Sequence, residues 1–213
     1  AGATAIDYAD RDLTGTSPKA SIAFDSGEDW TLRLSLGRGV RFPTVSELFQ
    51  GTSTASSITV NDPSLEAEIS DAVELTLERD LAIGHVRASL FQDDVRDSIS
   101  AQTNIAVTPH VTNVQNIDRV RSRGVELALS AAPAAWPALS LSGNLAYVRT
   151  RILGNRNNPT YVGAEWPRVP RWRGNLQTAY RPSPEWLASL GVHYSGRMYN
   201  RLENDDIHPD VYG

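Results

Sequence analysis

The sequence predicts an all-β protein, an antiparallel up-and-down transmembrane β-barrel segment of about eight strands. Two observations lead to this prediction. Along several segments the side chains alternate between apolar and polar, and the connections between these segments alternate between short and long. A strand with one face in lipid and the other in a wet lumen must change character at every residue. Tight turns at one rim and large loops at the other are typical of such a barrel.

The alternation recurs along most of the chain. In residues 30–36, Trp30 and three leucines share one face, and Thr31, Arg33 and Ser35 share the other. Residues 68–78 repeat the pattern, with Asp71 as the exception on the apolar face near the expected loop end. The other predicted strands are 18–25, 85–99, 124–130, 139–147, 171–180 and 186–195.

The connections distinguish a barrel from a soluble sandwich, whose strands also alternate. The short turns are 26–29, 81–84, 131–137 and 182–185, and the long excursions between them are 39–67, 101–113 and 151–167. Short and long connections therefore alternate without exception, which a Greek-key sandwich does not require. The barrel interpretation assigns the short turns to the periplasmic rim and the long loops to the extracellular rim.

Aromatic residues stand where the apolar band of a barrel would end. Trp172 and Tyr180 are eight residues apart on the apolar face, as are Trp186 and Tyr194. Eight residues of a tilted strand cover roughly 20 Å of height, which approximates the apolar band of an outer-membrane barrel. Tyrosine and tryptophan favour such boundaries because an apolar ring and a polar group can both be satisfied there.

Composition excludes several classes of protein. The 213 residues contain no cysteine, so disulfide scaffolds, thiolate metal sites and cysteine nucleophiles are excluded. No window approaches the roughly 18 apolar residues of a membrane-spanning helix. The net charge of −5 and the scattered arginines argue against nucleic-acid binding.

Several motifs in order along the chain resemble one family, the TonB-dependent receptors. The run LRLSLGRGVRFPT at 32–44 is followed by Glu47-Leu48-Phe49, and Thr44 with Glu47 forms a capping box that predicts a helical turn. The stretch NDPSLEAE at 61–68 is similar to a family motif, from which it departs by an inserted Asp62 and by Ala67 in place of a proline. Further matches are Glu74-Leu75, Phe91, Asp94 to Ile99, Asn116, Arg123-Gly124-Val125-Glu126, Val169-Pro170 and Tyr180.

The resemblance implies a bacterial outer-membrane transporter, a 22-stranded barrel closed by an N-terminal plug and driven by TonB. Residues 1–213 are then expected to be one partial barrel, lacking the plug, the region that contacts the TonB complex and the final strands. The implied partners are outer-membrane lipid, the plug, TonB and a small ligand. A ferric siderophore is the expected cargo, with cobalamin or a sugar as alternatives. A small eight-stranded anchor barrel and an outer-membrane enzyme remain the rival hypotheses.

No catalytic or metal-binding motif is evident, so we expect no enzyme activity, no cofactor and no metal site. The four histidines stand in no metalloprotease or serine-hydrolase motif. Glu74 and Glu78 share a strand face and could act as paired carboxylates, but a hydrated lumen in which they pair with arginine or with the plug explains them better. The residues expected to face the lumen are Glu74, Glu78, Glu126 and Arg173. The asparagine-rich runs 155–158 and 204–206 could bind calcium or serve only as turns.

Aromatic and arginine side chains of the long loops are the expected ligand contacts. Iron chelates are anionic and often aromatic, so stacking and charge-assisted hydrogen bonds would recognise them. The residues of this kind are Arg41, Phe49, Tyr161, Trp166, Arg197, Tyr199 and Arg201. Haem receptors of the family place a ligand histidine between the motifs found here at 41–44 and 61–65. No histidine lies between them in this chain, which argues against haem.

Overall fold

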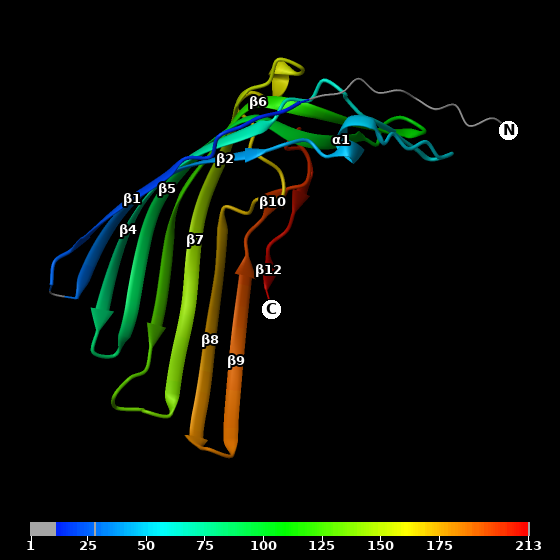
Figure 1. Ribbon diagram of the computed structural model, residues 1–213. Coiled ribbons are helices and arrows are strands. Elements are labelled where there is room, and N and C mark those ends of the chain that lie inside the picture. Colours follow the sequence, from blue (N-terminus) through cyan, green and yellow to red (C-terminus); the bar gives the residue numbers. More distant parts are fainter. Residues whose placement is uncertain (1–11, 28, 213) are drawn as a thin grey trace.

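The computed structural model describes residues 12–27 and 29–212, and most of them lie in one large curved sheet (Figure 1). The order of strands along this sheet is β1-β2-β4-β5-β6-β7-β8-β9-β12, and the pairs along this path are antiparallel. The long strands are β1 (Lys19–Asp25), β2 (Trp30–Arg41), β4 (Glu68–Leu81), β5 (Gly84–Asn104), β6 (His110–Ala131), β7 (Leu139–Gly154), β8 (Trp172–Ser183) and β9 (Trp186–Ser195).

Shorter elements occupy the loop end of the sheet. They are α1 (Val45–Phe49), β3 (Ser57–Val60), the 3-10 turn η1 (Pro159–Tyr161), β10 (Met198–Tyr199), β11 (Ile207–His208) and β12 (Val211–Tyr212). β3 pairs in parallel with β6, and β10 pairs with β11 outside the main sheet. Among the described residues, no helix has the length and apolar character needed to cross a membrane.

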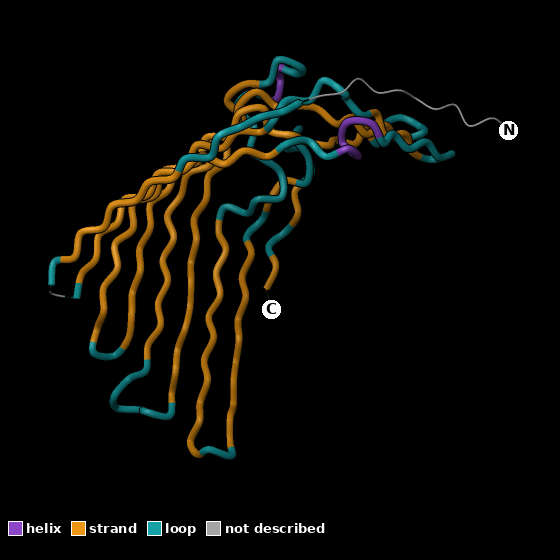
Figure 2. Tube along the Cα trace, in the orientation of Figure 1, coloured by secondary structure: helices purple, strands orange, loops and turns teal. Residues whose placement is uncertain are grey.

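Each long strand pairs with the next long strand along the chain, which is the topology of an up-and-down sheet. Figure 2 shows the short turns gathered at one end of the sheet and the longer loops at the other. All eight predicted strands are present, and the predicted all-β, antiparallel fold class is confirmed.

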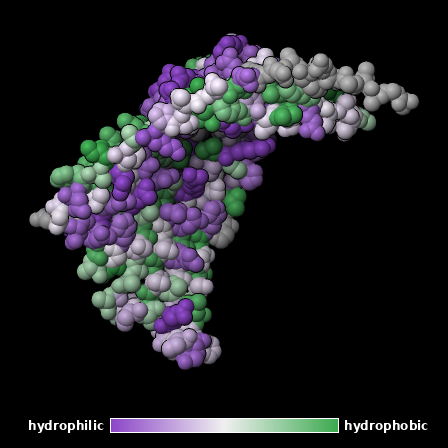
Figure 3. All heavy atoms as spheres, in the orientation of Figure 1, coloured by the Kyte–Doolittle hydropathy of each residue, from purple (hydrophilic) through white to green (hydrophobic). Residues whose placement is uncertain are grey.

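The pairing register divides the sheet into an apolar face and a polar face. Leu34 pairs with Leu75, Leu75 with Leu90, and Leu90 with Val125, so that an apolar row crosses four strands of the sheet. Between 38 and 54% of each of these four side chains is exposed, and hydrophobic residues reach the surface over the strands in Figure 3. We call this surface the leucine face. The leucine face is exposed, and along each strand apolar and polar side chains alternate. Both properties fit contact of this face with hydrocarbon.

The opposite face carries the polar residues and, at the loop end, two small buried clusters. Ile117, Val120, Ile152 and Leu202 form one cluster, against which Tyr161, Ala164 and Trp166 pack. Leu48, Leu65 and Val114 form the other, with Phe49 and Ile99 against it. The loops around α1 and η1 therefore fold against the sheet and are held there by apolar contacts.

All three predicted long loops begin too early. β2 runs to Arg41 and β7 to Gly154, inside the predicted excursions 39–67 and 151–167. Residues 101–113 were expected to form a long loop, but β5 continues to Asn104 and β6 begins at His110. The polar residues in this region hid an unbroken ladder, in which Ser100 pairs with Gln115 and Thr103 with Thr112. Backbone pairing and the burial of Val114 and Ile117 outweigh the loop-like composition.

Glycine and asparagine from the family-like motifs have direct structural roles. A Cβ on Gly124 would lie 2.2 Å from the carbonyl oxygen of Tyr147 and 2.8 Å from the ring of Phe91, so glycine is required there. The Asn116 side chain donates to the carbonyl oxygens of Asp97 and Glu66, at 2.6 and 3.2 Å, and accepts from the Glu66 amide at 2.8 Å. Asn116 therefore joins the segment before β4 to the β5–β6 hairpin.

The two faces predict different tolerance of charge at adjacent positions of β8. Leu176 lies on the leucine face midway between Trp172 and Tyr180, and Gln177 lies on the opposite face. We expect Leu176→Arg to destabilise the whole receptor by about 2–4 kcal/mol in a lipid bilayer, because the guanidinium would enter hydrocarbon. Unfolding of the refolded protein by guanidinium chloride measures this loss of stability. The matched variant Gln177→Arg should unfold like the wild type, and equal losses in both variants would contradict the assignment of faces.

Candidate ligand-binding site

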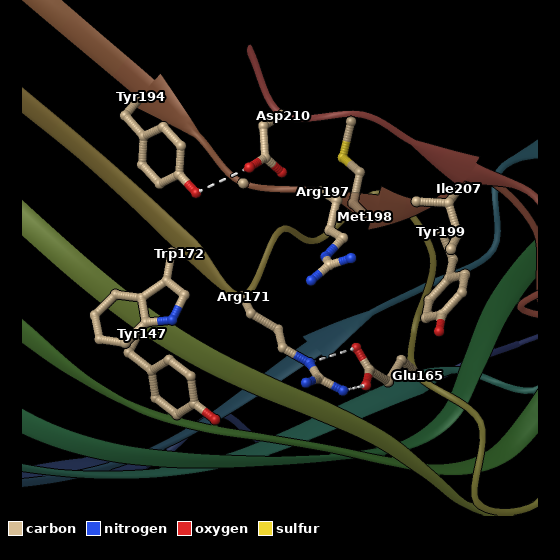
Figure 4. A pocket seen from close by; sticks show the side chains of 11 residues that line it. Tyr147, Glu165, Arg171, Trp172, Tyr194, Arg197, Met198, Tyr199, Ile207 and Asp210 are labelled. Carbon is tan, nitrogen blue, oxygen red and sulfur yellow. Dashed lines mark hydrogen bonds and ion pairs between the residues drawn. The ribbon is translucent and has the colours of Figure 1, made fainter. Parts of the chain in front are cut away.

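A cavity of about 430 Å³ lies at the loop end of the sheet, beside β7, β8 and β9 (Figure 4). Its lining combines aromatic rings, two arginines and two carboxylates. The lining residues are Tyr147, Glu165, Arg171, Trp172, Tyr194, Gly196, Arg197, Met198, Tyr199, Ile207 and Asp210. Concave sites with a few converging polar groups are the usual places for small ligands.

Three strands position the aromatic part of the lining. Tyr147 on β7 and Trp172 on β8 are register partners, and their ring centroids are 4.7 Å apart at an interplanar angle of 50°. Tyr194 on β9 donates its hydroxyl to Asp210 at 3.4 Å. Adjacent strands therefore bring together three rings that lie far apart in the sequence.

The charged part of the lining includes one internal ion pair and one arginine without such a partner. Arg171 donates from Nε to Glu165 at 3.1 Å, and a second hydrogen bond joins the same two side chains. Arg197 makes no ion pair with any carboxylate of the described residues. The guanidinium of Arg197 is therefore the group in this cavity best placed to receive an anion.

The loops behind the cavity are held together by Asn204. Its amide oxygen accepts from the Glu165 backbone N–H at 2.6 Å, and its amide nitrogen donates to the Glu165 carbonyl oxygen at 3.0 Å. The neighbouring Leu202 is fully buried in the cluster with Ile117 and Ile152. Asn204 thus fixes Glu165, and Glu165 in turn fixes Arg171.

The structure brings two of the seven expected ligand residues into this cavity, Arg197 and Tyr199. Arg201 lies in the same loop, but its guanidinium is 3.6 Å from Asp205 and 3.9 Å from Asp206. Tyr161 and Trp166 pack on the cluster behind the loop.

The hydroxyl of Tyr161 is engaged in the loop and does not line the cavity. It donates to Glu203 at 2.9 Å and accepts from Gln102 at 3.3 Å. Burial, with Glu203 beside it, raises the pKa of Tyr161 above its ordinary value, so the hydroxyl stays protonated.

The remaining two expected residues lie together at α1. Phe49 packs against the cluster of Leu48, Leu65 and Val114. Arg41 forms an ion pair with Glu47 at 3.1 Å, and Glu47 closes the capping box predicted at Thr44. Burial opposes ionisation of Glu47, but hydrogen bonds from Arg41 and Thr44 outweigh it and hold the pKa of the carboxyl below its ordinary value.

The four residues expected to face the lumen lie on the polar face and are joined by ion pairs. Arg87 lies 3.0 Å from Glu74 and 3.7 Å from Glu78. Arg173 lies 3.6 Å from Glu126. Glu74 also accepts hydrogen bonds from Thr76 and Ser89. Each carboxylate therefore has an arginine partner, which is not an arrangement for acid–base catalysis.

The asparagine-rich runs act as turns. Asn155 accepts from the Asn158 backbone N–H at 3.0 Å, Asn158 accepts from the Thr160 backbone N–H at 3.3 Å, and Asn204 bridges two loops. In residues 12–27 and 29–212, no cluster of three acidic, histidine or cysteine side chains could hold a metal ion.

Sequence reasoning did not single out Glu165, Arg171, Trp172, Tyr194 or Asp210 as lining residues. Trp172 and Tyr194 were predicted to mark the edge of the apolar band, and they also form a wall of the cavity. Their position at the loop ends of β8 and β9 was the available signal, because the extracellular mouth begins where those strands end.

Comparison with known proteins agrees with this architecture. The family model for the β-barrel of TonB-dependent receptor-like proteins matches residues 1–211. The copper transporter OprC covers 92% of this chain with a TM-score of 0.71 at 18% identity, and the match spans 29% of that protein. A mutant ferric enterobactin receptor, PfeA of Pseudomonas aeruginosa, in complex with enterobactin covers 92% with a TM-score of 0.68 at 16% identity, over 31% of its own length.

A third solved structure, the ferric yersiniabactin uptake receptor FyuA of Yersinia pestis, covers 91% of this chain with a TM-score of 0.67 at 18% identity. The match spans 28% of that receptor. This chain therefore spans about a third or less of the length of the three structures.

The fold and the family match define a transmembrane β-barrel segment of the bacterial outer membrane. The chain belongs to the TonB-dependent receptor family, with its matched residues in the β-barrel domain.

The bridge made by Asn204 leads to a testable consequence for the loops around the cavity. Asn204→Ala removes both hydrogen bonds to Glu165, at a cost of about 1–2 kcal/mol, so local opening should become roughly tenfold more frequent. Limited trypsin digestion of the whole receptor, followed at Arg197 and Arg201, measures the opening. Asn200→Ala removes only a 3.3 Å contact with Asp206 and serves as the control. Equal digestion rates in both variants would refute the bridging role.

The depressed pKa of Glu47 leads to a pH dependence at α1. Its stabilising contribution is complete above the ordinary pKa of a glutamate and is lost as the pH falls through the lower, folded-state pKa. Hydrogen-exchange protection of the Leu48 amide, which donates to Thr44, should therefore fall on acidification after correction for intrinsic exchange. In Glu47→Gln the protection should be weaker at neutral pH and should not change with acidification. If protection in Glu47→Gln still falls on acidification as it does in the wild type, the titrating group is not Glu47.

Proposed function

We propose that this chain forms part of the wall and outer mouth of a TonB-energised receptor that imports a ferric siderophore. The observation that carries the proposal is the cavity at the loop end, where aromatic rings surround Arg197 and Arg171. A ferric chelate of the aromatic type offers π faces and negative charge. Stacking and charge-assisted hydrogen bonds from these side chains match both properties.

The location of the cavity supports this proposal. Tight turns mark the periplasmic rim and long loops mark the extracellular rim of such barrels, so a cavity among the loops lies at the extracellular end of the strands. The plug, the remaining strands and the contact with TonB would lie in parts of the receptor outside these 213 residues. The described portion would then contribute one side of the binding site and the plug another.

Copper is the second candidate cargo, because one similar structure is a copper transporter. Met198 lines the cavity, and its thioether is a ligand type that copper accepts. However, Met198 is the only methionine of the chain and there is no cysteine. The arginines of the lining also favour an anion over a bare cation, so the chelate remains our proposal.

Uptake by a strain lacking the gene tests the proposal. Under iron starvation this strain should fail to grow on at least one ferric siderophore that supports the parent, with ferric enterobactin and ferric yersiniabactin among the chelates supplied. Normal growth of the deletion strain on every chelate, together with a loss of copper accumulation, would replace iron by copper as the cargo.

Binding to variants of the whole receptor tests the site. We expect Arg197→Ala to weaken binding of the transported chelate by about tenfold, since a charge-assisted hydrogen bond is lost. Intrinsic fluorescence quenching by the chelate measures the affinity. Arg181→Ala, at the turn end of β8, removes the same charge far from the cavity and should bind like the wild type. Unchanged binding in Arg197→Ala would exclude this cavity as the binding site.

A further inference from the structure

Beyond the siderophore site, β6 and β7 carry a second concentration of positive charge. Arg121 pairs with Arg151 and Arg123 with Arg149, and these two rows directly follow the row of Val125 and Tyr147. Register partners and every second residue of a strand share a face. These arginines therefore extend the leucine face toward the loop end of the sheet.

The four guanidinium-bearing side chains enclose a small cavity. It has a volume of about 190 Å³ and is lined by Arg121, Arg123, Arg149, Arg151 and Leu153. We call it the four-arginine cavity. Because its lining holds cationic and apolar side chains, it favours an anion attached to, or next to, an apolar group.

One carboxylate neutralises only part of this charge. Asp94 accepts hydrogen bonds from Arg121 at 2.9 and 3.0 Å and also lies 3.3 Å from Arg119. Within the described part of the chain, Arg123, Arg149 and Arg151 form no ion pair with a carboxylate. The cavity therefore retains a net positive charge.

Repulsion between the facing arginines lowers the stability of the folded sheet unless an anion is present. Like charges that face each other across paired strands are destabilising, and this cavity contains two such pairs in adjacent rows. An anion between them would convert repulsion into charge-assisted hydrogen bonds. The backbone ladder of β6 and β7 continues through the arginines, so the sheet holds them in place in the absence of any anion.

The position of the four-arginine cavity along the membrane normal indicates which anion it meets. Tyr147 and Trp172 are in contact at the boundary of the apolar band, and the next rows of β6 and β7 lie roughly 7–13 Å further along the strands. That distance places the cavity in the headgroup layer, on the side of the long loops. The outer leaflet of this membrane is built from lipid A, whose headgroup carries phosphates.

We propose that the four-arginine cavity binds a phosphate of a lipid A headgroup, whose acyl chains lie along the leucine face below it. Guanidinium groups bind phosphate oxygens with paired, directional hydrogen bonds. Leu153 and the apolar rows accommodate the attached lipid. The site depends on the outer-membrane location of the family and not on the cargo, so loss of the siderophore proposal leaves it intact.

Lipid binding to the whole receptor in detergent tests this site. The purified, delipidated protein is titrated with fluorescent diphosphorylated lipid A, with the same lipid after removal of its phosphates, and with inorganic phosphate as competitor. We expect the diphosphorylated lipid to bind at least about tenfold more tightly than the dephosphorylated one, and Arg123→Ala with Arg149→Ala to remove about that factor. Inorganic phosphate should compete only weakly, because it lacks the acyl chains.

A matched variant and a stability measurement separate binding from structure. Arg33→Ala removes one arginine charge from the polar face of β2, where Arg33 forms no ion pair with the described residues. This variant should leave lipid binding unchanged. In lipid-free detergent the double variant should unfold no earlier than the wild type, because it relieves repulsion.

Three outcomes would overturn the proposal. The first is equal lipid binding by the double variant and the wild type. The second is equal affinity for the phosphorylated and dephosphorylated lipids, and the third is competition by inorganic phosphate as strong as by the lipid. If the double variant does not fold, the charge-retaining variant Arg123→Lys with Arg149→Lys is compared with the equally substituted, charge-removing variant Arg123→Gln with Arg149→Gln. The lysine variant should keep more of the affinity than the glutamine variant, and the reverse order also contradicts the proposal.

Discussion

The pairing of backbone N–H and C=O groups between neighbouring strands is the constraint on which the rest of this structure depends. A strand in hydrocarbon has no water to satisfy these groups, so each one must find a partner on the next strand. The ladder from β1 to β9 provides these partners, with register shifts at Arg119/Val120 and at Tyr180/Ser183. Once the register is set, alternation decides which side chains meet lipid and which meet the lumen. Leu75 and Glu74 are neighbours in sequence and face opposite environments for this reason.

On the polar face, the same register places charged and polar side chains of neighbouring strands next to each other. Cross-strand neighbours there form ion pairs and hydrogen bonds, such as those of Glu74 with Arg87 and of Glu126 with Arg173. At the loop end the packing changes, because Leu202 and Trp166 bring the loops inward onto Val120 and Ile152. The cavity lined by Arg171 and Arg197 lies beside this inward packing, so its shape depends on the loops as much as on the strands.

Local sequence predicts the parts of the fold that local chemistry determines. Alternation found the strands, and Thr44 with Glu47 predicted the capped turn of α1, because both patterns act over a few residues. The extension of β5 to Asn104 and the start of β6 at His110 were missed, since pairing between polar residues of two strands leaves no periodic signal. The residues of the candidate ligand-binding site also divide into those that nearby sequence predicts and those that depend on contacts between distant residues. Arg197 and Tyr199 could be selected as loop residues, whereas the contact of Asn204 with Glu165 joins positions 39 residues apart and could not be foreseen.

The small strand β3 bears on how the protein behaves beside its neighbours. β6 pairs with β5 along almost its whole length, but β7 accompanies it only from Arg119 to Ala131, so the first part of β6 has one side without a long partner. Ser57 to Val60 of β3 cover His110 to Asn113 on that side through a parallel ladder. An uncovered edge is a template for strand addition by another chain. Four residues of β3 therefore occupy backbone groups of β6 that would otherwise stay open to strand addition by a neighbouring molecule.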